Sequence, residues 1–485
     1  MFLRAGAVSL ALLLASRLLG VVRESAQAAA FGRSGMADIA VLLLTLPDLL
    51  VSIAATGALA YVLLPAWAGQ PAAAVAALQR RVAWRGALAA AAVGVLLAAA
   101  HEPVLHALAG GLPPGWRPAG AQALLWAAAA LPFALVAALW STRLQHERDF
   151  LGMYGANLVV NVLLIAGLLV AARVATTAAV LALGTALLLA MGARLAWLRL
   201  RMPAVAPSRE PVHVAMPPAH LWTWAVLAAA LPLLLPFTAR SAASQAGEGA
   251  LAVFNYAWKL VELPLLLAIQ LVASLSFPAV ARALAADAPR EKAAAPIRLA
   301  FGLAWALACA AVSGLAWAAP ALARILFGWG RMPEDALVHV AQWGIAGSWG
   351  LLPQAVSAVA LTVLAARRQL RAPVLAYAAA FALLVVAALA GVRDGSTLML
   401  LLNAGFLGVA LACVLALGRD AREWLPTRAF GWSALAMFAT AAPGYALQPA
   451  TLPALAGLGA GALAAATVLA FALWRAPELR QGLRR

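Results

Sequence analysis

Residues 16–68 read SRLLGVVRESAQAAAFGRSGMADIAVLLLTLPDLLVSIAATGALAYVLLPAWA, and the rest of the chain can be interpreted from this segment. It forms an apolar hairpin that nevertheless carries Arg17, Arg23, Glu24, Asp38 and Asp48 at or near membrane depth. A charged side chain at the bilayer centre costs at least about 2.5 kcal/mol, so such residues normally face a bundle interior or a watery cavity. We therefore expect a functional site in this hairpin.

Composition places the whole chain in a membrane. Hydrophobic residues make up 65% of the 485 residues and charged residues 11%, whereas soluble domains contain about 25% charged residues. The two cysteines, Cys309 and Cys413, lie inside apolar runs, so they indicate buried small side chains and no disulfide framework. The chain is expected to be an all-α polytopic membrane protein.

A membrane-spanning helix needs about 20 apolar residues, and on that rule the sequence predicts about 14 transmembrane helices. Their expected ranges are 5–31, 36–67, 85–100, 122–140, 154–172, 176–197, 221–243, 250–281, 297–318, 337–365, 373–392, 397–417, 430–447 and 452–474. The opening residues are expected to belong to the first helix and not to a cleaved signal peptide. Pro47, Pro132, Pro232, Pro236, Pro264 and Pro353 fall within spans, where they predict kinks.

The basic residues predict the orientation, because cytoplasmic loops collect Lys and Arg. With a cytoplasmic N terminus, 24 of the 34 basic residues fall in cytoplasmic segments and seven in periplasmic ones. Arg143 and Arg194 are counted among the cytoplasmic residues. Three remain inside spans: Arg17, Arg23 and Lys259. The net charge of +17 is therefore explained by topology and not by nucleic-acid binding, and both termini are predicted to be cytoplasmic.

A polar, proline-rich segment predicts the domain organisation. Residues 199–220, RLRMPAVAPSREPVHVAMPPAH, form the expected cytoplasmic linker. The N-terminal lobe would then comprise residues 1–198 with six helices, and the C-terminal lobe residues 221–418 with six more. Residues 419–485 would add two C-terminal helices and a basic tail.

Motifs of enzymes are missing from the sequence. It contains no HExxH, GxSxG or P-loop pattern and no His or Cys cluster at metal-ligand spacing. We expect a protein without catalytic residues, metal or cofactor.

The hairpin also resembles a known family. The run Ser16 to Glu24, Phe31-Gly32, Asp38 and Leu46-Pro47-Asp48-Leu49-Leu50 resemble the N-terminal signature of the MurJ (MviN) lipid II flippases of the MOP exporter superfamily. Weaker matches follow at Tyr256 to Pro264 and at Leu326 to Gly330. The resemblance implies two six-helix lobes around a central cavity, as in MATE transporters. It also implies translocation of lipid II, a polyprenyl-pyrophosphate-linked peptidoglycan precursor, from the cytoplasmic to the periplasmic leaflet by alternating access.

That resemblance also implies partners and a location. The substrate would be a lipid-linked oligosaccharide of the undecaprenyl-pyrophosphate type, in the bacterial inner membrane. Cell-wall synthesis proteins would be possible partners, and nucleic acid would not be one.

Six charged residues are the candidate site. Arg17, Arg23 and Lys259 are expected to bind the diphosphate, since a guanidinium donates two hydrogen bonds to phosphate and stays charged when desolvated. Glu24, Asp38 and Glu262 are expected to pair with them or to act in gating. One alternative is that Arg17 and Glu24 form a structural pair while Arg23 snorkels to the interface. Another is that Lys259 and Glu262, at i and i+3, form only a static salt bridge.

Three departures from the family pattern leave the substrate open. Val51 stands where the family has an arginine, Thr56 where it has a glutamate, and Trp258 where it has an acid. The alternatives are a flippase for another lipid-linked oligosaccharide, such as an exopolysaccharide or O-antigen unit, or a non-transporting membrane scaffold. Residues 221–243 and 373–392 contain no acid, which disfavours a sodium site there. Coupling to membrane potential, or to protons through Asp38 or Glu262, stays open.

Overall fold

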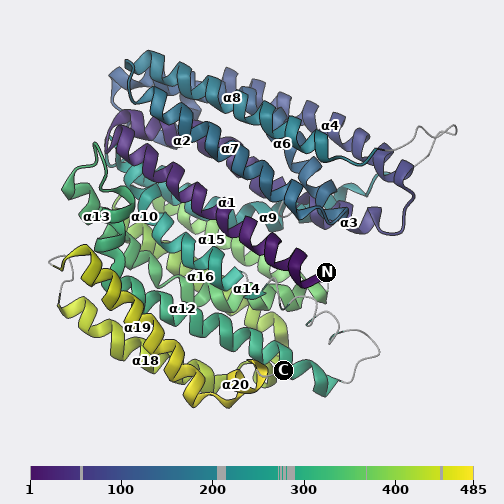
Figure 1. Ribbon diagram of the computed structural model, residues 1–485, viewed down its shortest axis with the longest axis vertical. Coiled ribbons are helices and arrows are strands. Elements are labelled where there is room, and N and C mark those ends of the chain that lie inside the picture. Colours follow the sequence, from purple (N-terminus) through teal and green to yellow (C-terminus); the bar gives the residue numbers. More distant parts are fainter. Residues whose placement is uncertain are drawn as a thin grey trace. The chain divides into compact units, whose positions relative to one another are not determined.

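The computed structural model describes residues 2–54, 58–204, 215–270, 272–273, 276, 280, 284, 290–367, 369–447 and 452–483. Within these residues the chain is built from helices, with no strand (Figure 1). It divides into two compact units. Unit 1 comprises Met1–Leu234, Ser244–Ala252 and Gly330–Met332, and unit 2 comprises Leu235–Ala243, Val253–Trp329 and Pro333–Arg485. The sequence-based lobe boundaries stay a prediction, and most of the expected linker, residues 205–214, lies outside the described residues.

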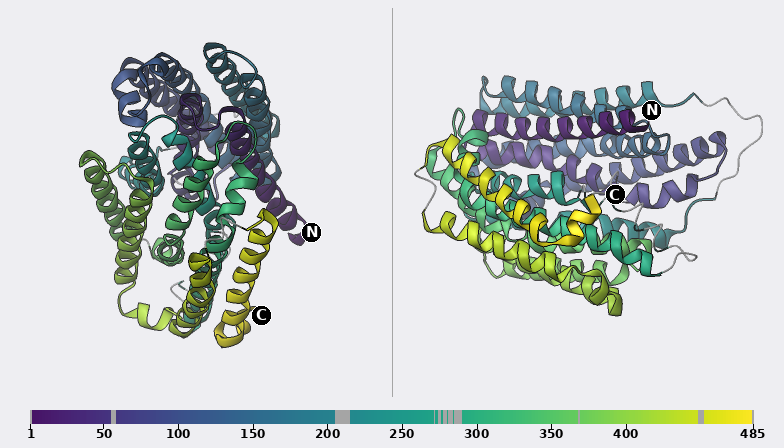
Figure 2. Two further views of the ribbon diagram at one scale, coloured as in Figure 1. Left: turned by 90° about the vertical axis from the view of Figure 1, so that its left-hand side faces the viewer. Right: turned by 60° about the horizontal axis from the view of Figure 1, so that its bottom comes forward.

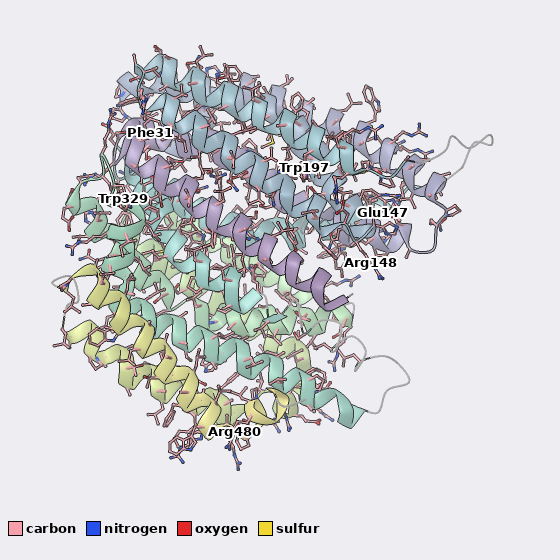
Figure 3. The ribbon with its side chains drawn as sticks, in the orientation of Figure 1. Phe31, Glu147, Arg148, Trp197, Trp329 and Arg480 are labelled. Atoms are coloured by element: carbon pink, nitrogen blue, oxygen red, sulfur yellow. The ribbon has the colours of Figure 1, made fainter. Side chains whose placement is uncertain are left out.

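Unit 1 contains the helices of the N-terminal half. They are α1 (Phe2–Phe31), α2 (Gly35–Ile53), α3 (Leu59–Trp67), α4 (Ala72–Ala99), α5 (His101–Ala109), the 3-10 turn η2 (Pro114–Trp116), α6 (Arg117–His146), α7 (Phe150–Ala171), α8 (Thr176–Arg201) and most of α9 (Ala219–Ser244). In this unit Phe31 lies at one end of the long helices, and Glu147 and Arg148 lie at the other (Figure 3). The Phe31 end is the one that the charge pattern predicts to be periplasmic.

Unit 2 contains the helices of the C-terminal half. They are α10 (Ala250–Pro264), the π-helical segment η3 (Leu265–Ile269), α12 (Arg290–Phe327), α13 (Glu334–Ser348), α14 (Leu351–Ala366), α15 (Arg371–Leu389), α16 (Gly395–Leu417), η4 (Gly418–Asp420), α17 (Ala421–Trp424), α18 (Thr427–Ala446), α19 (Ala454–Arg475) and α20 (Pro477–Leu483). The long helices α12, α18 and α19 run side by side in both views of Figure 2. The second half of the eighth predicted span, residues 271–281, lies largely outside the described residues.

Small residues let these helices approach closely, as is usual for membrane helices. In unit 1 a Cβ on Gly94 of α4 would lie 2.8 Å from the carbonyl oxygen of Ala128 in α6. In unit 2 a Cβ on Gly461 of α19 would lie 2.6 Å from the Cβ of Ala318 in α12. The alanine and glycine content of the sequence thus serves helix packing.

Membrane spans can be counted by length and composition. Among the described residues, 11 helices are long and apolar enough to cross a membrane, or 12 if α13 and α14 form one bent span. The expected number of 14 transmembrane helices is consistent with this count and stays a prediction. The tenth predicted span is bent by 47° between α13 and α14, next to Pro353, whose ring cannot continue the hydrogen bonding of the preceding turn. Pro264 is followed directly by the π-helical segment η3.

One helix of unit 1 begins well before its predicted membrane span. The third predicted span begins at residue 85, but α4 begins at Ala72 and therefore includes Arg80 and Arg81, which precede that span. The helix extends beyond its most apolar part because alanine and leucine continue the helical pattern through the basic residues. Basic residues mark the membrane boundary and not the helix end.

Two glycines of the family-like motifs lie at one backbone contact in unit 1. Gly32 and Gly330 both have positive φ, +60° and +68°, and the backbone N–H of Arg331 donates to the carbonyl oxygen of Ala29 at 3.1 Å. A Cβ on Gly330 would lie 2.3 Å from that same oxygen, and one on Gly32 would lie 2.2 Å from the Arg331 carbonyl oxygen. Only glycine fits both positions.

We therefore expect Gly330→Ala to destabilise the protein by about 2 kcal/mol or more, because positive φ and a backbone clash add. Thermal unfolding of the purified protein in detergent measures this. Gly192→Ala in α8 is the matched control, since a Cβ there meets nothing within 4 Å and alanine favours a helix. An unchanged unfolding temperature for Gly330→Ala would show that the contact does not constrain the fold.

Candidate functional site

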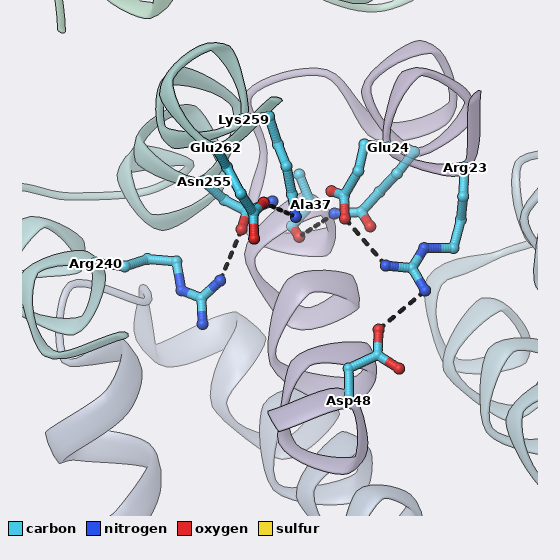
Figure 4. Close-up of polar contacts among 9 residues, drawn as sticks. Arg23, Glu24, Ala37, Asp48, Arg240, Asn255, Lys259 and Glu262 are labelled. Atoms are coloured by element: carbon cyan, nitrogen blue, oxygen red, sulfur yellow. Dashed lines mark hydrogen bonds and ion pairs between the residues drawn. The ribbon is translucent and has the colours of Figure 1, made fainter. Parts of the chain in front are cut away.

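Arg23 is the centre of the charged cluster in unit 1. Its Nη2 lies 3.1 Å from Oε1 of Glu24, the next residue on α1, and its Nη1 lies 3.0 Å from Oδ2 of Asp48 on α2 (Figure 4). Only 11% of the Arg23 side chain is exposed, against 8% for Glu24 and 39% for Asp48. The alternative in which Arg23 snorkels away is therefore wrong, because two carboxylates hold its guanidinium inside the unit.

The stability of this cluster depends strongly on every charge keeping its partner. A buried ion pair gains little net free energy over apolar packing, yet removing one partner costs several kcal/mol because a charge is left buried and unpaired. Here one guanidinium pairs with two carboxylates, so the loss of Arg23 breaks both ion pairs at once. Such a cation is suited to exchanging one anion for another.

Arg17 lies two turns earlier on α1 and is exposed. Its electrostatic neighbour is Tyr154 of α7, and it makes no ion pair with Glu24 among the described residues. The alternative in which Arg17 and Glu24 form a structural pair is therefore wrong, since Glu24 pairs with its chain neighbour Arg23. Arg17 is left as an accessible cation.

Arg194 is a buried cation that the sequence reasoning misplaced. It was counted among the cytoplasmic residues, but it lies within α8 with 4% of its surface exposed. Asp48 is its electrostatic neighbour, and its Nε is buried without a hydrogen-bond partner in the described part of the chain. Arg143, counted in the same way, is 2% exposed within α6, where it pairs with Glu147 at 2.6 Å and lies over the ring of Trp67. Position near a helix end does not reveal which side of the helix an arginine occupies.

Asp38 is 2% exposed and caps a helix. Its Oδ2 accepts a hydrogen bond from the N–H of Gly249 at 2.7 Å, and its Oδ1 accepts one from the N–H of Ala252 at 2.9 Å. These donors belong to the start of α10, where free N–H groups and the helix dipole favour a carboxylate. Glu248 reciprocates, because its Oε1 accepts from the N–H of Gly35 at the start of α2, at 2.7 Å. Asp38 thus binds α10 and not an arginine of α1.

In unit 2 the spacing at i and i+3 brings Lys259 and Glu262 together. Nζ of Lys259 donates to Oε2 of Glu262 at 2.7 Å, and the two side chains are 24% and 28% exposed. One turn away, Nη1 of Arg240 on α9 donates to Oδ1 of Asn255 on α10 at 2.7 Å (Figure 4). The face of α10 that carries Lys259 is therefore polar and partly open.

Each unit contains a hollow that is lined by none of the predicted site residues. One of about 290 Å³ in unit 2 is lined by leucines and a proline of α10, η3 and α12, including Leu260, Pro264 and Leu326. One of about 220 Å³ in unit 1 is lined by residues that include Phe31, Trp116 and Arg331. Among the described residues no three His, Cys, Asp or Glu side chains are grouped to hold a metal ion.

The sequence matches one family over almost its full length. The model of a family described as lipid II flippase MurJ matches residues 27–473. The chain belongs to the MurJ lipid II flippase family. The predicted family is confirmed. A sequence search of curated proteins gave no significant match.

Solved structures share the fold of this MurJ-family chain. A lipid II flippase MurJ in an inward closed conformation has a TM-score of 0.81 and 14% identity, covering 99% of this chain and 100% of that one. An inward-facing MATE multidrug transporter of the MOP superfamily has a TM-score of 0.58 and 14% identity, covering 87% and 95%. A MOP superfamily transporter from Pyrococcus furiosus has a TM-score of 0.55 and 13% identity, covering 86% and 94%. The predicted all-α, MATE-like polytopic fold is confirmed.

MurJ membership decides between the function classes left open by the sequence. The family is one of transporters that act on a lipid-linked substrate in the membrane, and the chain is a multi-pass membrane protein of that family. Membership supports lipid II translocation and does not favour the exopolysaccharide, O-antigen or scaffold alternatives.

Proposed function

We propose that this protein flips lipid II from the cytoplasmic to the periplasmic leaflet of a bacterial inner membrane by alternating access, without catalysing a covalent reaction. The observation that carries the proposal is the buried guanidinium of Arg23, held between Glu24 and Asp48 inside an apolar helical unit of a MurJ-family chain. Both termini would be cytoplasmic, and cell-wall synthesis enzymes would supply and consume the substrate.

Arg17, Arg23 and Lys259 would bind the diphosphate of the substrate. Arg17 is exposed and would meet the anion first, whereas Arg23 would exchange a carboxylate for a phosphate oxygen. Lys259 is partly exposed and pairs with the carboxylate of Glu262, which the diphosphate would replace. Guanidinium and ammonium groups remain charged throughout transport. What changes is the anion with which each of them pairs.

Glu24, Asp38 and Glu262 would act as pairing or gating groups. Glu24 and Glu262 neutralise cations when no diphosphate is bound. Asp38 would hold the start of α10 through its bonds to Gly249 and Ala252 and release it when the transporter changes conformation. The two six-helix lobes predicted from the sequence would be the moving bodies.

Complementation tests the function. In cells depleted of their lipid II flippase, the wild type should restore growth and the delivery of lipid II to the periplasmic leaflet. Arg393→Ala, which removes an exposed arginine from a loop, should restore both equally. Failure of the wild type at normal membrane abundance would contradict lipid II flipping, and export of another lipid-linked glycan in the same cells would identify the substrate instead.

Substitution of Lys259 refines that test. Lys259→Ala is expected to lower lipid II flipping about tenfold, because it removes one charge-assisted contact to the diphosphate and leaves the half-buried Glu262 unpaired. Lys259→Arg should retain or exceed wild-type flipping, since the guanidinium keeps the charge and adds a second donor. Flipping is measured in proteoliposomes with matched protein content. Full flipping by Lys259→Ala would show that the pair with Glu262 is only a static salt bridge.

A further inference from the structure

Arg194 is a buried cation whose position calls for an explanation. It lies seven residues before the end of α8, about 10 Å inside that end at the 1.5 Å rise of a helix. Arg199 and Arg201 of the same helix are exposed, whereas only 4% of the Arg194 surface is exposed. Arg194 therefore points into unit 1, where a charge is costly unless it is paired.

Arg194 makes no hydrogen bond or ion pair among the described residues. Its helix α8 packs against α2, which places Arg194 within electrostatic range of Asp48. The Asp48 carboxylate already accepts a hydrogen bond from Nη1 of Arg23 at 3.0 Å. Nε of Arg194 and Nε of Arg23 are both buried and have no hydrogen-bond partner among the described residues. One carboxylate is thus bonded to one guanidinium and within electrostatic range of a second, and both guanidinium groups retain unused donors.

Asp48 is also the accessible member of this trio. Its side chain is 39% exposed, compared with 11% for Arg23 and 4% for the whole of Arg194. An anion that approaches from the exposed side would reach Asp48 first and find the two guanidinium groups behind it.

We infer that Arg194 is a further substrate-binding residue, which forms with Arg23 a two-guanidinium site for the diphosphate of the lipid-linked substrate, and that Asp48 is the internal counter-ion that the diphosphate displaces. The inference rests on the proposed function. A diphosphate fits this site better than a carboxylate does, because it brings more negative charge and enough acceptor oxygens for two planar donor forks. Displacement lets Asp48 turn to solvent, where a carboxylate is well hydrated.

Direct binding tests the inference. The full chain is reconstituted in lipid nanodiscs, and dissociation constants are measured for undecaprenyl diphosphate and undecaprenyl monophosphate. Arg194→Gln is expected to weaken binding of the diphosphate about tenfold, the loss of one charge-assisted contact. The discrimination between diphosphate and monophosphate should shrink as well. Arg199→Gln, the control that removes a charge from the exposed side of the same helix, should leave both constants unchanged.

Asp48→Asn gives the opposite expectation. It removes the competing charge while keeping the shape of the side chain, so the diphosphate should bind several-fold more tightly than to the wild type. Because the gain depends on Arg23 and Arg194, it should be smaller when Arg194→Gln is also present. The double variant further controls for folding, since it removes the pair without leaving a lone charge.

The outcomes separate the inference from the proposed function. If Arg23→Gln weakens diphosphate binding and Arg194→Gln does not, Arg194 is structural and the inference is overturned while the proposed function stands. If Asp48→Asn binds the diphosphate no more tightly than the wild type does, Asp48 is not the counter-ion that the diphosphate displaces. If the wild type binds neither undecaprenyl diphosphate nor lipid II, the proposed function itself fails and the inference falls with it.

Discussion

Replacing Arg23 by alanine is expected to abolish lipid II flipping, with a fall in rate of about 100-fold or more. The change removes a bidentate phosphate donor and the guanidinium that bridges Glu24 and Asp48. Breaking a buried ion pair costs about 3 to 5 kcal/mol. The effect on folding stability should lie at or below the lower limit of that range, because Asp48 is 39% exposed and partly hydrated.

Two further variants separate charge from stability. Arg23→Lys keeps the charge but not the planar fork, so it should fold like the wild type and flip lipid II slowly. Arg23→Gln combined with Asp48→Asn removes two opposite charges together, and it should regain much of the stability lost in Arg23→Ala without regaining transport. Flipping in proteoliposomes and thermal unfolding are measured on the same preparations. Recovery of transport in the double variant would show that Arg23 acts only by holding the helices together.

The sequence predicted the contacts that a single helix determines. Lys259 and Glu262 meet because residues at i and i+3 lie on one side of any α-helix. The same regularity gave the apolar helices themselves and, through the basic residues, their expected orientation. Local periodicity is enough for these features because no second element has to be placed.

The contacts between helices could not be predicted in the same way. The Arg23–Asp48 ion pair depends on how α1 and α2 are aligned across the turn between them. From α1 alone, the Arg23 side chain could point either into the helix bundle or toward the membrane interface. Arg194 was missed because an arginine near the end of an apolar segment usually marks the cytoplasmic boundary. Only the packing of α8 against α2 brings its side chain within electrostatic range of Asp48. The one signal in the sequence was Asp48 itself, an acid within an apolar helix and with no local partner.

Asp38 illustrates the largest gap between sequence and structure. Its hydrogen-bond donors are 211 and 214 residues away along the chain, and no local pattern links them. The sequence indicated only that a charged residue at the start of an apolar helix needs a partner. The partner proved to be a helix N-terminus, which has no sequence signature beyond the glycine that precedes it.

Asp38→Ala is expected to disable transport and to loosen the start of α10. The change leaves the N–H groups of Gly249 and Ala252 without an acceptor, and each unsatisfied buried donor costs about 1 to 3 kcal/mol. Segment Ser244–Ala252 belongs to unit 1, while α10 continues into unit 2 from Val253. Asp38 therefore holds a segment from which a whole helix of the other unit extends, and its loss should affect conformational change as well as stability.

A thiol reporter distinguishes the two effects. Ser244 is 2% exposed and near-isosteric with cysteine, and the native Cys309 and Cys413 are buried. In a Ser244→Cys background, Asp38→Ala should raise the labelling rate by a membrane-impermeant thiol reagent about tenfold or more, the factor that a loss of about 1.4 kcal/mol in local stability gives. Asp38→Asn keeps one carbonyl acceptor and should give an intermediate rate. Glu248→Gln is the matched control, because its carbonyl can still accept from Gly35. Unchanged labelling in Asp38→Ala would show that Asp38 does not hold the segment, and any loss of transport would then have to arise from the substrate site.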